Sequence, residues 1–195
     1  DDATTRIRAL RGNTALKARA TDFMRDSIGA QYSYNFKWMG RPIIQYPQDM
    51  MAMQEILWEV RPDLIIETGI AHGGSLVYYA SLCELMAHGE VLSINIDIRP
   101  HNREAIEAHP MFKRIQLMQG SSTDPALLAH VHAMAAGKKV LVVLDSNHTH
   151  EHVVAEMQAY APLVSIDSYC VVYDTVIEEL PPGLYPDRPW DVGNN

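Results

Sequence analysis

The chain has 195 residues, of which 47% are hydrophobic, and a formal net charge of -8. This length can bury a sizeable core in a single domain, and the acidic balance argues against a nucleic-acid enzyme, which needs a basic surface for phosphates. A small neutral or cationic substrate is still permitted. Two cysteines in apolar segments favour reduced thiols and a cytoplasmic location, and no apolar run approaches the roughly 20 residues of a membrane span.

Residues 1–47 are predicted to form an N-terminal extension to a main domain over residues 48–195. A helix is expected over Thr4–Ile28, where apolar residues recur at helical spacing. The following segment, Tyr32–Pro47, is irregular and aromatic, so it could cover a binding pocket or attach the extension to the core. The helix and the aromatics could also form an interface in a homo-oligomer. The candidate lid residues are Tyr32, Tyr34, Phe36 and Trp38.

Helical and strand patterns alternate from Pro47 onward. Helices are expected over Pro47–Val60, from the glycine turn to His88, and over Asn102–Ala108, Pro125–Met134 and His150–Tyr160. Strands are expected over Leu64–Ile66, Val91–Ile96, Ile115–Met118, Lys139–Leu144 and Tyr169–Tyr173. This alternation predicts an α/β fold with a doubly wound, mostly parallel sheet. The proline-rich tail Glu178–Asn195 is expected to be a loop, and a complete domain is expected to continue beyond it with further strands.

The segment Leu64–Ser75 combines an apolar strand, a glycine turn and the start of a helix. Its strand ends at Glu67, and Gly69, Gly73 and Gly74 follow. Glycines let the backbone approach a ligand closely, and a helix start offers unpaired N–H groups. The turn lacks the glycine order that seats a pyrophosphate in nicotinamide enzymes, and Glu67 would repel one. An acid there would accept a cationic amino group, which favours S-adenosylmethionine over a dinucleotide.

Acidic residues also end the later strands, at Asp97, Asp145 and Asp174. Ligands of open α/β sheets bind at these carboxyl ends, although any single acid could instead cap a helix. Asp97 lies near the spacing at which an acid reaches ribose hydroxyls. Ser121 and Ser122 could contact adenine or cap the next helix. Asp145 and Asp174 could share Mg²⁺, which takes oxygen ligands.

Three alternate histidines, His148, His150 and His152, follow Asp145. They could form a zinc or iron site, although their order does not match a metallo-hydrolase motif. His148 lies three residues after the strand-end acid, where an imidazole with its pKa near 6.5 could deprotonate a substrate hydroxyl. A solvated histidine at a helix start is the alternative.

The segments Glu67–Ser75, Asp97–Arg99, Gly120–Asp124 and Leu144–Val153 together resemble the cephalosporin hydroxylase/rhamnosyl O-methyltransferase family. The resemblance spans about residues 36–175. It implies the Rossmann-like class I fold of S-adenosylmethionine-dependent methyltransferases, similar to the metal-dependent catechol O-methyltransferases. It further implies that His148 and Asp145 are catalytic and that Asp145 and Asp174 bind metal. The implied cofactor residues are Glu67, Gly69, Ala71, Gly73, Ser75, Asp97, Arg99, Ser121, Ser122 and Asp145.

One position departs from the family pattern. The fifth strand of the family usually ends in two acids, but Tyr173 replaces the first of them here. The departure puts Mg²⁺ dependence in doubt, though not the binding of S-adenosylmethionine.

The sequence thus predicts an O-methyltransferase for a hydroxyl of a sugar or other polar small molecule. The alternatives are a non-haem iron oxygenase, a nicotinamide-dependent dehydrogenase and a non-catalytic cofactor-binding module.

Overall fold

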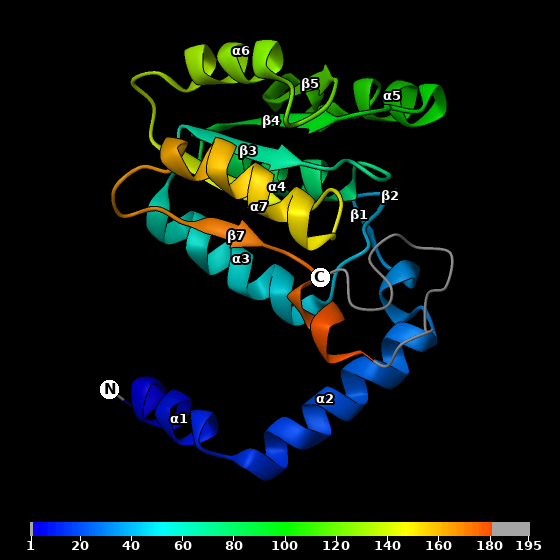
Figure 1. The fold of residues 1–195 in the computed structure, drawn as a ribbon, viewed down its shortest axis with the longest axis vertical. Helices are drawn as coiled ribbons and strands as arrows, with labels where there is room; N and C mark the ends of the chain where they lie inside the picture. The colour runs from blue at the N-terminus through cyan, green and yellow to red at the C-terminus, as the bar shows by residue number, and fades with distance from the viewer. Residues whose placement is uncertain (1, 181–195) are drawn as a thin grey trace.

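A computed structural model describes residues 2–180 of the chain (Figure 1). Five strands form a parallel sheet in the order β5-β4-β3-β6-β7. Their bounds are β3 Leu64–Thr68, β4 Glu90–Asn95, β5 Ile115–Gln119, β6 Val140–Leu144 and β7 Cys170–Val172. Two further strands, β1 (Lys37–Trp38) and β2 (Arg41–Pro42), form a short antiparallel pair. The predicted doubly wound, mostly parallel sheet is confirmed.

The two central strands show why the sequence forms this sheet. Every residue of β3 and of β6 is buried, and the strands pair in parallel with Ile65 opposite Leu141. Strands covered on both faces have no exposed side, so their sequences are continuous apolar runs rather than alternating patterns. Glu67 and Thr68 are the polar residues of β3, and both lie at its carboxyl end.

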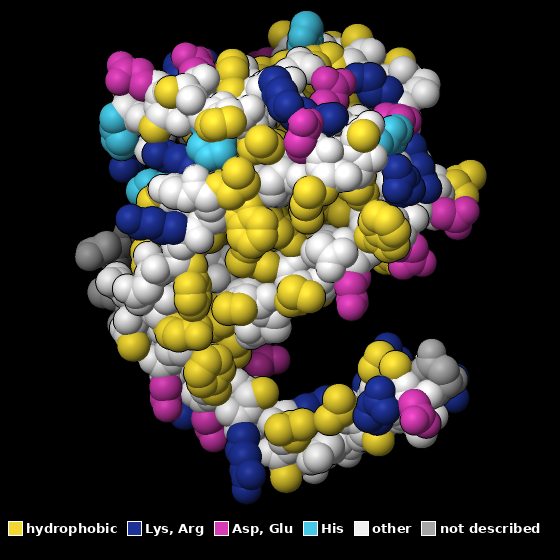
Figure 2. Space-filling view, turned by 180° about the vertical axis from the view of Figure 1, so that it is seen from behind, with side chains coloured by type: hydrophobic (Ala, Val, Ile, Leu, Met, Phe, Trp, Pro, Cys, Tyr) yellow, Lys and Arg dark blue, Asp and Glu magenta, His cyan; other side chains and the backbone are white. Residues whose placement is uncertain are grey.

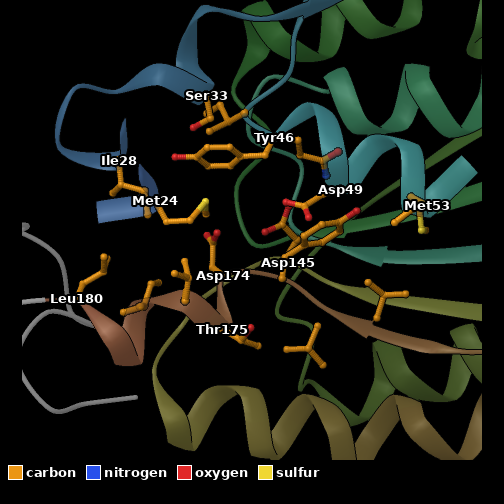
Figure 3. Close-up of a pocket in the computed structure, with 18 of the residues that line it drawn as sticks. Met24, Ile28, Ser33, Tyr46, Asp49, Met53, Asp145, Asp174, Thr175 and Leu180 are labelled. Carbon is orange, nitrogen blue, oxygen red and sulfur yellow. The ribbon is translucent and has the colours of Figure 1, made fainter. Parts of the chain in front are cut away.

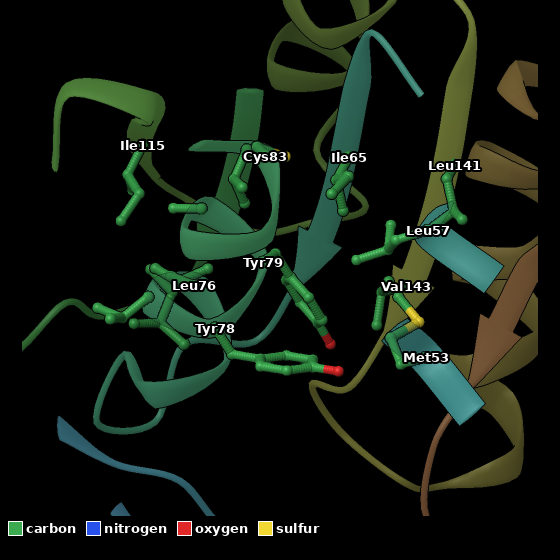
Figure 4. Packing of buried hydrophobic residues seen from close by; sticks show 14 of the residues in the cluster. Met53, Leu57, Ile65, Leu76, Tyr78, Tyr79, Cys83, Ile115, Leu141 and Val143 are labelled. Atoms are coloured by element: carbon green, nitrogen blue, oxygen red, sulfur yellow. The ribbon is translucent and has the colours of Figure 1, made fainter. Parts of the chain in front are cut away.

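Helices cover both faces of the sheet. One face packs against α3 (Pro47–Val60), α4 (Gly74–Leu85) and Ile106 of α5 (Pro100–Glu107), and the other against α6 (Pro125–Ala135) and α7 (His150–Tyr160). Figure 4 shows Leu57 of α3 and Tyr79 of α4 against Ile65 of β3. Full burial of one such apolar side chain stabilises the fold by roughly 1.5–3 kcal/mol. Short 3₁₀ segments complete the chain: η1 Tyr32–Asn35, η2 Pro110–Arg114, η3 Ala161–Leu163 and η4 Thr175–Glu179.

The strand order places a crevice between the carboxyl ends of β3 and β6. The chain passes from β3 through β4 to β5 on one side, and β6 and β7 lie on the other side of β3. Ligands of such sheets bind where the strand order reverses. The backbone there is closely packed, because Asp145 N–H donates to the Thr68 carbonyl at 2.9 Å. A Cβ on Gly69 would lie 1.9 Å from the Asp145 carbonyl oxygen, so this position requires glycine.

The N-terminal prediction of one helix over Thr4–Ile28 is wrong. The structure has two helices, α1 (Asp2–Arg11) and α2 (Thr14–Gly29), separated at Gly12 and Asn13. Glycine disfavours helix interiors, and the Asn13 side chain accepts a hydrogen bond from Leu16 N–H at 2.9 Å as the cap of α2.

These two helices form an arm that projects from the domain. All residues of α1 and nearly all of α2 are exposed, Figure 1 shows the two helices projecting from the domain, and Figure 2 shows a hollow between the arm and the rest of the molecule. Neither the arm nor any other helix within residues 2–180 is both long and apolar enough to cross a membrane. Most of the expected C-terminal loop, Glu178–Asn195, lies outside the described residues, and Glu178 and Glu179 belong to η4.

Candidate active site

Two cavities meet at the crevice between β3 and β6. The large cavity has a volume of about 360 Å³ and extends from Asp145 and Asp174 to Met24 and Ile28 of the arm (Figure 3). The turn cavity, of about 40 Å³, lies at the glycine turn. Asp145 lines both cavities, so a group bound in one would lie next to a group bound in the other.

Asp145, His148 and Asp174 form a polar group, and its two acids line the large cavity. Each offers one atom to a group whose members lie within 4.8 Å of one another. His148 Nε2 is 3.0 Å from Asp174 Oδ2, and 16% of the His148 side chain is exposed. The β6–α7 loop supplies the first two residues, and the left-handed turn after β7, where Asp174 has φ 59°, supplies the third. The structure therefore brings together the three residues predicted to carry metal and base chemistry.

The charges in this group alter its proton affinities. Burial raises the pKa of Asp145 well above its usual value, and the neighbouring charges of Asp174 and Glu67 raise it further. Burial alone would lower the pKa of His148, but the hydrogen bond to Asp174 and the charges of Asp174 and Asp145 raise it overall. Such a site favours a cation, because each carboxylate makes ionisation of its neighbour more costly.

The other histidines lie apart from this group. His150 is exposed at the start of α7, and His152 Nε2 contacts Glu156 Oε1 at 3.2 Å and Ser122 Oγ at 3.4 Å. The metal-binding group found within residues 2–180 thus contains one histidine, His148. The alternative of an iron oxygenase needs two histidines and one carboxylate around an open iron, which the described residues do not assemble.

The glycine turn is shaped by close backbone contacts. Gly73 has φ 79° and begins α4, and a Cβ there would lie 2.4 Å from Ile106 Cδ1. Ala71 has φ 44°, and its carbonyl accepts a hydrogen bond from Asn102 Nδ2 at 2.9 Å. Gly69, Ala71 and Ser75 line the turn cavity.

Glu67 has a different place from the one expected. Its side chain is completely buried beneath the turn, lines neither cavity, and accepts a hydrogen bond from Ser75 Oγ at 3.1 Å. The carboxylate therefore supports the turn through Oε2 and Ser75, while its Oε1 has no hydrogen-bond partner among the described residues. Burial raises the pKa of Glu67 to about 8, an effect that the nearby hydroxyl groups of Ser75 and Tyr79 reduce.

The remaining cofactor candidates follow β4 and β5. Asp97 and Arg99 are exposed, and the Asp97 carbonyl accepts a hydrogen bond from Asn95 Nδ2 at 2.5 Å. Ser121 Oγ lies 3.1 Å from Thr123 Oγ1, and Ser122 is 7% exposed. These residues lie at the same carboxyl edge of the sheet as the turn, but neither cavity includes them.

The aromatic lid prediction requires correction. Of the four candidates only Tyr34 lines the large cavity. Trp38 packs edge-on against Tyr78 and donates from Nε1 to Ser81 Oγ at 3.0 Å, so it attaches the extension to α4. Tyr32 and Phe36 pack against each other with ring centroids 5.0 Å apart. Aromatic side chains can bury large apolar areas. Tyr32, Phe36 and Trp38 therefore pack within the extension or against the core rather than covering the large cavity.

Sequence reasoning missed Asp49 and Gln45. Asp49 of α3 lines the large cavity, and Gln45 is buried and lines both cavities (Figure 3 labels Asp49). Tyr46, which also lines the large cavity, belongs to the aromatic segment Tyr32–Pro47 that was expected either to cover a pocket or to attach the extension. Burial raises the pKa of Asp49, and the nearby charge of Asp174 raises it further. The only sequence signal was the position of Asp49 in the first turn of a predicted helix, where an acid is ordinary.

The fold and the site together define a class. A parallel sheet in this order, a glycine turn after its central strand and acids at the following strand ends characterise the Rossmann-like class I methyltransferases.

Comparisons with known proteins identify the family within that class. The family model described as Rhamnosyl O-methyltransferase/CmcI matches residues 30–195. The rhamnosyl O-methyltransferase of Mycobacterium bovis (strain BCG / Pasteur 1173P2) is 32% identical over 181 residues, covering 86% of this chain and 71% of the relative. The protein of the same name from Mycobacterium leprae (strain TN) is 31% identical, covering 80% and 70%.

Solved structures of CmcI share the fold. One, whose name includes SAH, has a TM-score of 0.52 at 23% identity and is covered over 66% of its length by 71% of this chain. Another, named for Mg and SAM, has a TM-score of 0.54 at 22% identity, with 58% of its length and 73% of this chain covered. The chain thus spans just under two thirds of the first of these structures.

The chain belongs to the rhamnosyl O-methyltransferase/CmcI family. It is therefore a methyltransferase of the S-adenosylmethionine-dependent kind, as its sequence predicted.

Proposed function

We propose that this chain transfers a methyl group from S-adenosylmethionine to a hydroxyl of a sugar or another polar small molecule, with assistance from a divalent metal. The observation that carries the proposal is the group Asp145, His148 and Asp174, whose two acids line the large cavity and which adjoins the turn cavity at Asp145. This arrangement puts acidic ligands at the junction of two binding spaces, with a base, His148, in contact with one of them.

The turn cavity fits the methionine end of the cofactor. Gly69, Ala71, Gly73 and Ser75 surround or shape it, and the uncapped start of α4 directs backbone N–H groups toward it. We assign Asp97 and Arg99 to the ribose end and Ser121 and Ser122 to the adenine end. This assignment is supported by their positions along the same edge of the sheet.

The large cavity fits a neutral or cationic acceptor. Three carboxylates line it, those of Asp49, Asp145 and Asp174, and its described lining includes neither lysine nor arginine. A phosphate or carboxylate on the acceptor would be repelled there, whereas hydroxyl groups can donate to these oxygens. The relatives named rhamnosyl O-methyltransferase also favour a sugar hydroxyl.

His148 is suited to remove the proton of that hydroxyl. Its Nε2 is 3.0 Å from Oδ2 of Asp174, which lines the large cavity, and this contact fixes the orientation of the imidazole ring. An imidazole in this position can accept a proton at near-neutral pH. Methyl transfer itself needs the oxygen, carbon and sulfur in line, so the main task of the protein is to hold both substrates in that geometry.

The acidic ligands fit a hard divalent ion such as Mg²⁺. Asp145 and Asp174 supply carboxylate oxygens, and Mg²⁺ commonly keeps several waters in addition to one or two protein carboxylates. Such an ion would lower the pKa of an acceptor hydroxyl bound to it. Tyr173 lines the cavity where the family has a further acid, and burial raises its pKa, so it stays neutral.

Binding and turnover experiments test this proposal. The protein should bind S-adenosylhomocysteine but not NAD in calorimetric titrations, and it should release S-adenosylhomocysteine when supplied with neutral glycosides. Mg²⁺ should increase this rate and a chelator should abolish it. His148→Ala should lower kcat by about a hundredfold, while the exposed His150→Ala serves as the matched control. An undiminished rate in His148→Ala would contradict the proposed role of His148 as the base. A rate that does not change when a chelator is added would contradict the proposed role of the metal.

A further inference from the structure

One face of α7 contacts the last residue of β3 and the loops after β5 and β6. His152, Glu156 and Tyr160 are four residues apart, so they share this face of the helix. Glu156 is 1% exposed and Tyr160 is completely buried. Neither has a part in the proposed chemistry, and a buried carboxylate is costly unless hydrogen bonds satisfy it.

Glu156 joins the two sides of the crevice. Its Oε2 accepts a hydrogen bond from Thr68 Oγ1 at 3.2 Å, and its Oε1 accepts one from Ser146 Oγ at 2.7 Å. Thr68 directly precedes Gly69 of the glycine turn, and Ser146 directly follows Asp145. The Thr68 carbonyl also accepts the Asp145 N–H at 2.9 Å. The backbone of Asp145 is therefore held on both of its sides.

His152 and Tyr160 extend these contacts to the loop after β5. His152 Nε2 lies 3.2 Å from Glu156 Oε1 and 3.4 Å from Ser122 Oγ. The Tyr160 hydroxyl donates to the Ser122 carbonyl at 2.7 Å. The same helix face thus contacts the proposed methionine, acceptor and adenine regions.

The loop between β6 and α7 depends on these contacts for its position. It has no regular structure, and the His148–Asp174 contact and a local hydrogen bond from Thr149 N–H to Asn147 Oδ1 also hold it. Loss of the Glu156–Ser146 hydrogen bond would free the segment that carries Asp145 and His148. Small displacements matter in group transfer, where an error of about 1 Å can reduce the rate about a hundredfold.

We infer that Glu156 is a positioning residue that holds the Asp145 loop against the glycine turn, and that His152 links this carboxylate to the adenine loop at Ser122. The inference rests on the proposed function, because it assigns the two ends of S-adenosylmethionine to these loops. It assigns no contact with a substrate to Glu156 itself.

The two links predict different ligand dependences. Ser146→Ala should weaken S-adenosylhomocysteine binding about tenfold, the worth of one hydrogen bond, yet leave adenosine binding within about twofold. Glu156→Gln should weaken the binding of both ligands, because Glu156 contacts His152 as well as Ser146. His152→Ala should weaken both ligands equally, because it acts on the adenine loop. The double variant Glu156→Gln/Ser146→Ala should lose less affinity than the sum of the two single losses, since both changes affect the Glu156–Ser146 hydrogen bond.

The measurements are dissociation constants from calorimetry on the full chain, with folding of each variant checked by circular dichroism. Glu151→Gln, an exposed glutamate on α7, is the matched control and should bind both ligands as the parent does. If Glu156→Gln does not fold, Ser146→Ala still tests the inference, because Ser146 is an exposed loop residue.

Three results would overturn the inference. Unchanged S-adenosylhomocysteine affinity in a folded Glu156→Gln or Ser146→Ala variant would show that the contact is only structural. Equal losses for adenosine and S-adenosylhomocysteine in Ser146→Ala would show that the Ser146 contact does not act through the Asp145 loop alone. Failure of the parent protein to bind S-adenosylhomocysteine at all would instead overturn the proposed function, and this role with it.

Discussion

The burial of Glu67 has a measurable consequence for stability. Its carboxyl group is completely buried beneath the glycine turn, with Ser75 Oγ as its hydrogen-bond donor, and burial raises its pKa to about 8. The folded protein therefore holds a proton on Glu67 that the unfolded chain releases at ordinary acidic pH. The free energy of unfolding must then fall as the pH rises from about 4.5 to about 8.

The size of the effect follows from the two proton affinities. Each tenfold change in proton affinity corresponds to about 1.4 kcal/mol, so a rise in pKa from 4.5 to about 8 corresponds to roughly 5 kcal/mol. The stabilising contribution is complete below about pH 4.5, declines as the pH rises, and is lost above about pH 8. Between pH 5 and pH 9 the loss is about 4 kcal/mol, a large part of the stability of an ordinary domain.

Glu67→Gln removes the titration and keeps an oxygen that can accept from Ser75. We expect the variant to resemble the parent near pH 5 and to exceed its free energy of unfolding by about 4 kcal/mol at pH 9. Urea denaturation across this range measures the difference, with Glu55→Gln, an exposed glutamate of α3, as the matched control. Parallel stability curves for Glu67→Gln and the parent would refute a buried, proton-binding Glu67.

Two further predictions concern the crevice and the arm. Gly69→Ala should lower the free energy of unfolding by roughly 3 kcal/mol or more, because its Cβ would collide with the Asp145 carbonyl. Gly137→Ala, which has a positive φ but no atom within 4 Å of the added Cβ, should cost only about 1 kcal/mol in the same denaturation assay; equal losses would contradict the collision. Because Ile7 and Leu10 of the arm are 53% and 51% exposed, we expect self-association through the arm. Replacing both with serine should reduce the mass measured by light scattering to that of a monomer, and an unchanged mass would contradict this expectation.

The sheet could be predicted because its central strands satisfy a strong physical constraint. Strands buried on both faces must be apolar throughout, and the segments around Ile65 and Val142 have no competing pattern. The acids could be placed for a related reason. Parallel strands bring their carboxyl ends to one edge, so Asp145 and Asp174 had to lie near each other once the strands were assigned.

Side-chain directions in irregular segments could not be predicted in this way. Tyr34 and Trp38 are both aromatic and only four residues apart, yet Tyr34 lines the large cavity and Trp38 packs against α4. Their directions depend on the backbone of η1 and β1, which has no periodicity for a sequence pattern to reveal. The break between α1 and α2 was missed for a different reason. Apolar residues continue at helical spacing across Gly12 and Asn13, and this periodicity outweighed two local signals for a helix end and a cap.

The large cavity has an acid from α3, Asp49, in addition to those at the strand ends, and this changes the consequence of having Tyr173 where the family has an acid. Tyr173 takes the place of one acid at the end of the fifth strand, and burial keeps its phenol neutral by raising its pKa. Asp49, more than a hundred residues earlier in the chain, lines the same cavity together with Asp145 and Asp174. The pKa of Asp49 is raised by burial and by the charge of Asp174, so the two acids act on each other across the cavity. The cavity therefore keeps three carboxylates, one of them supplied by α3, although one strand end has lost an acid.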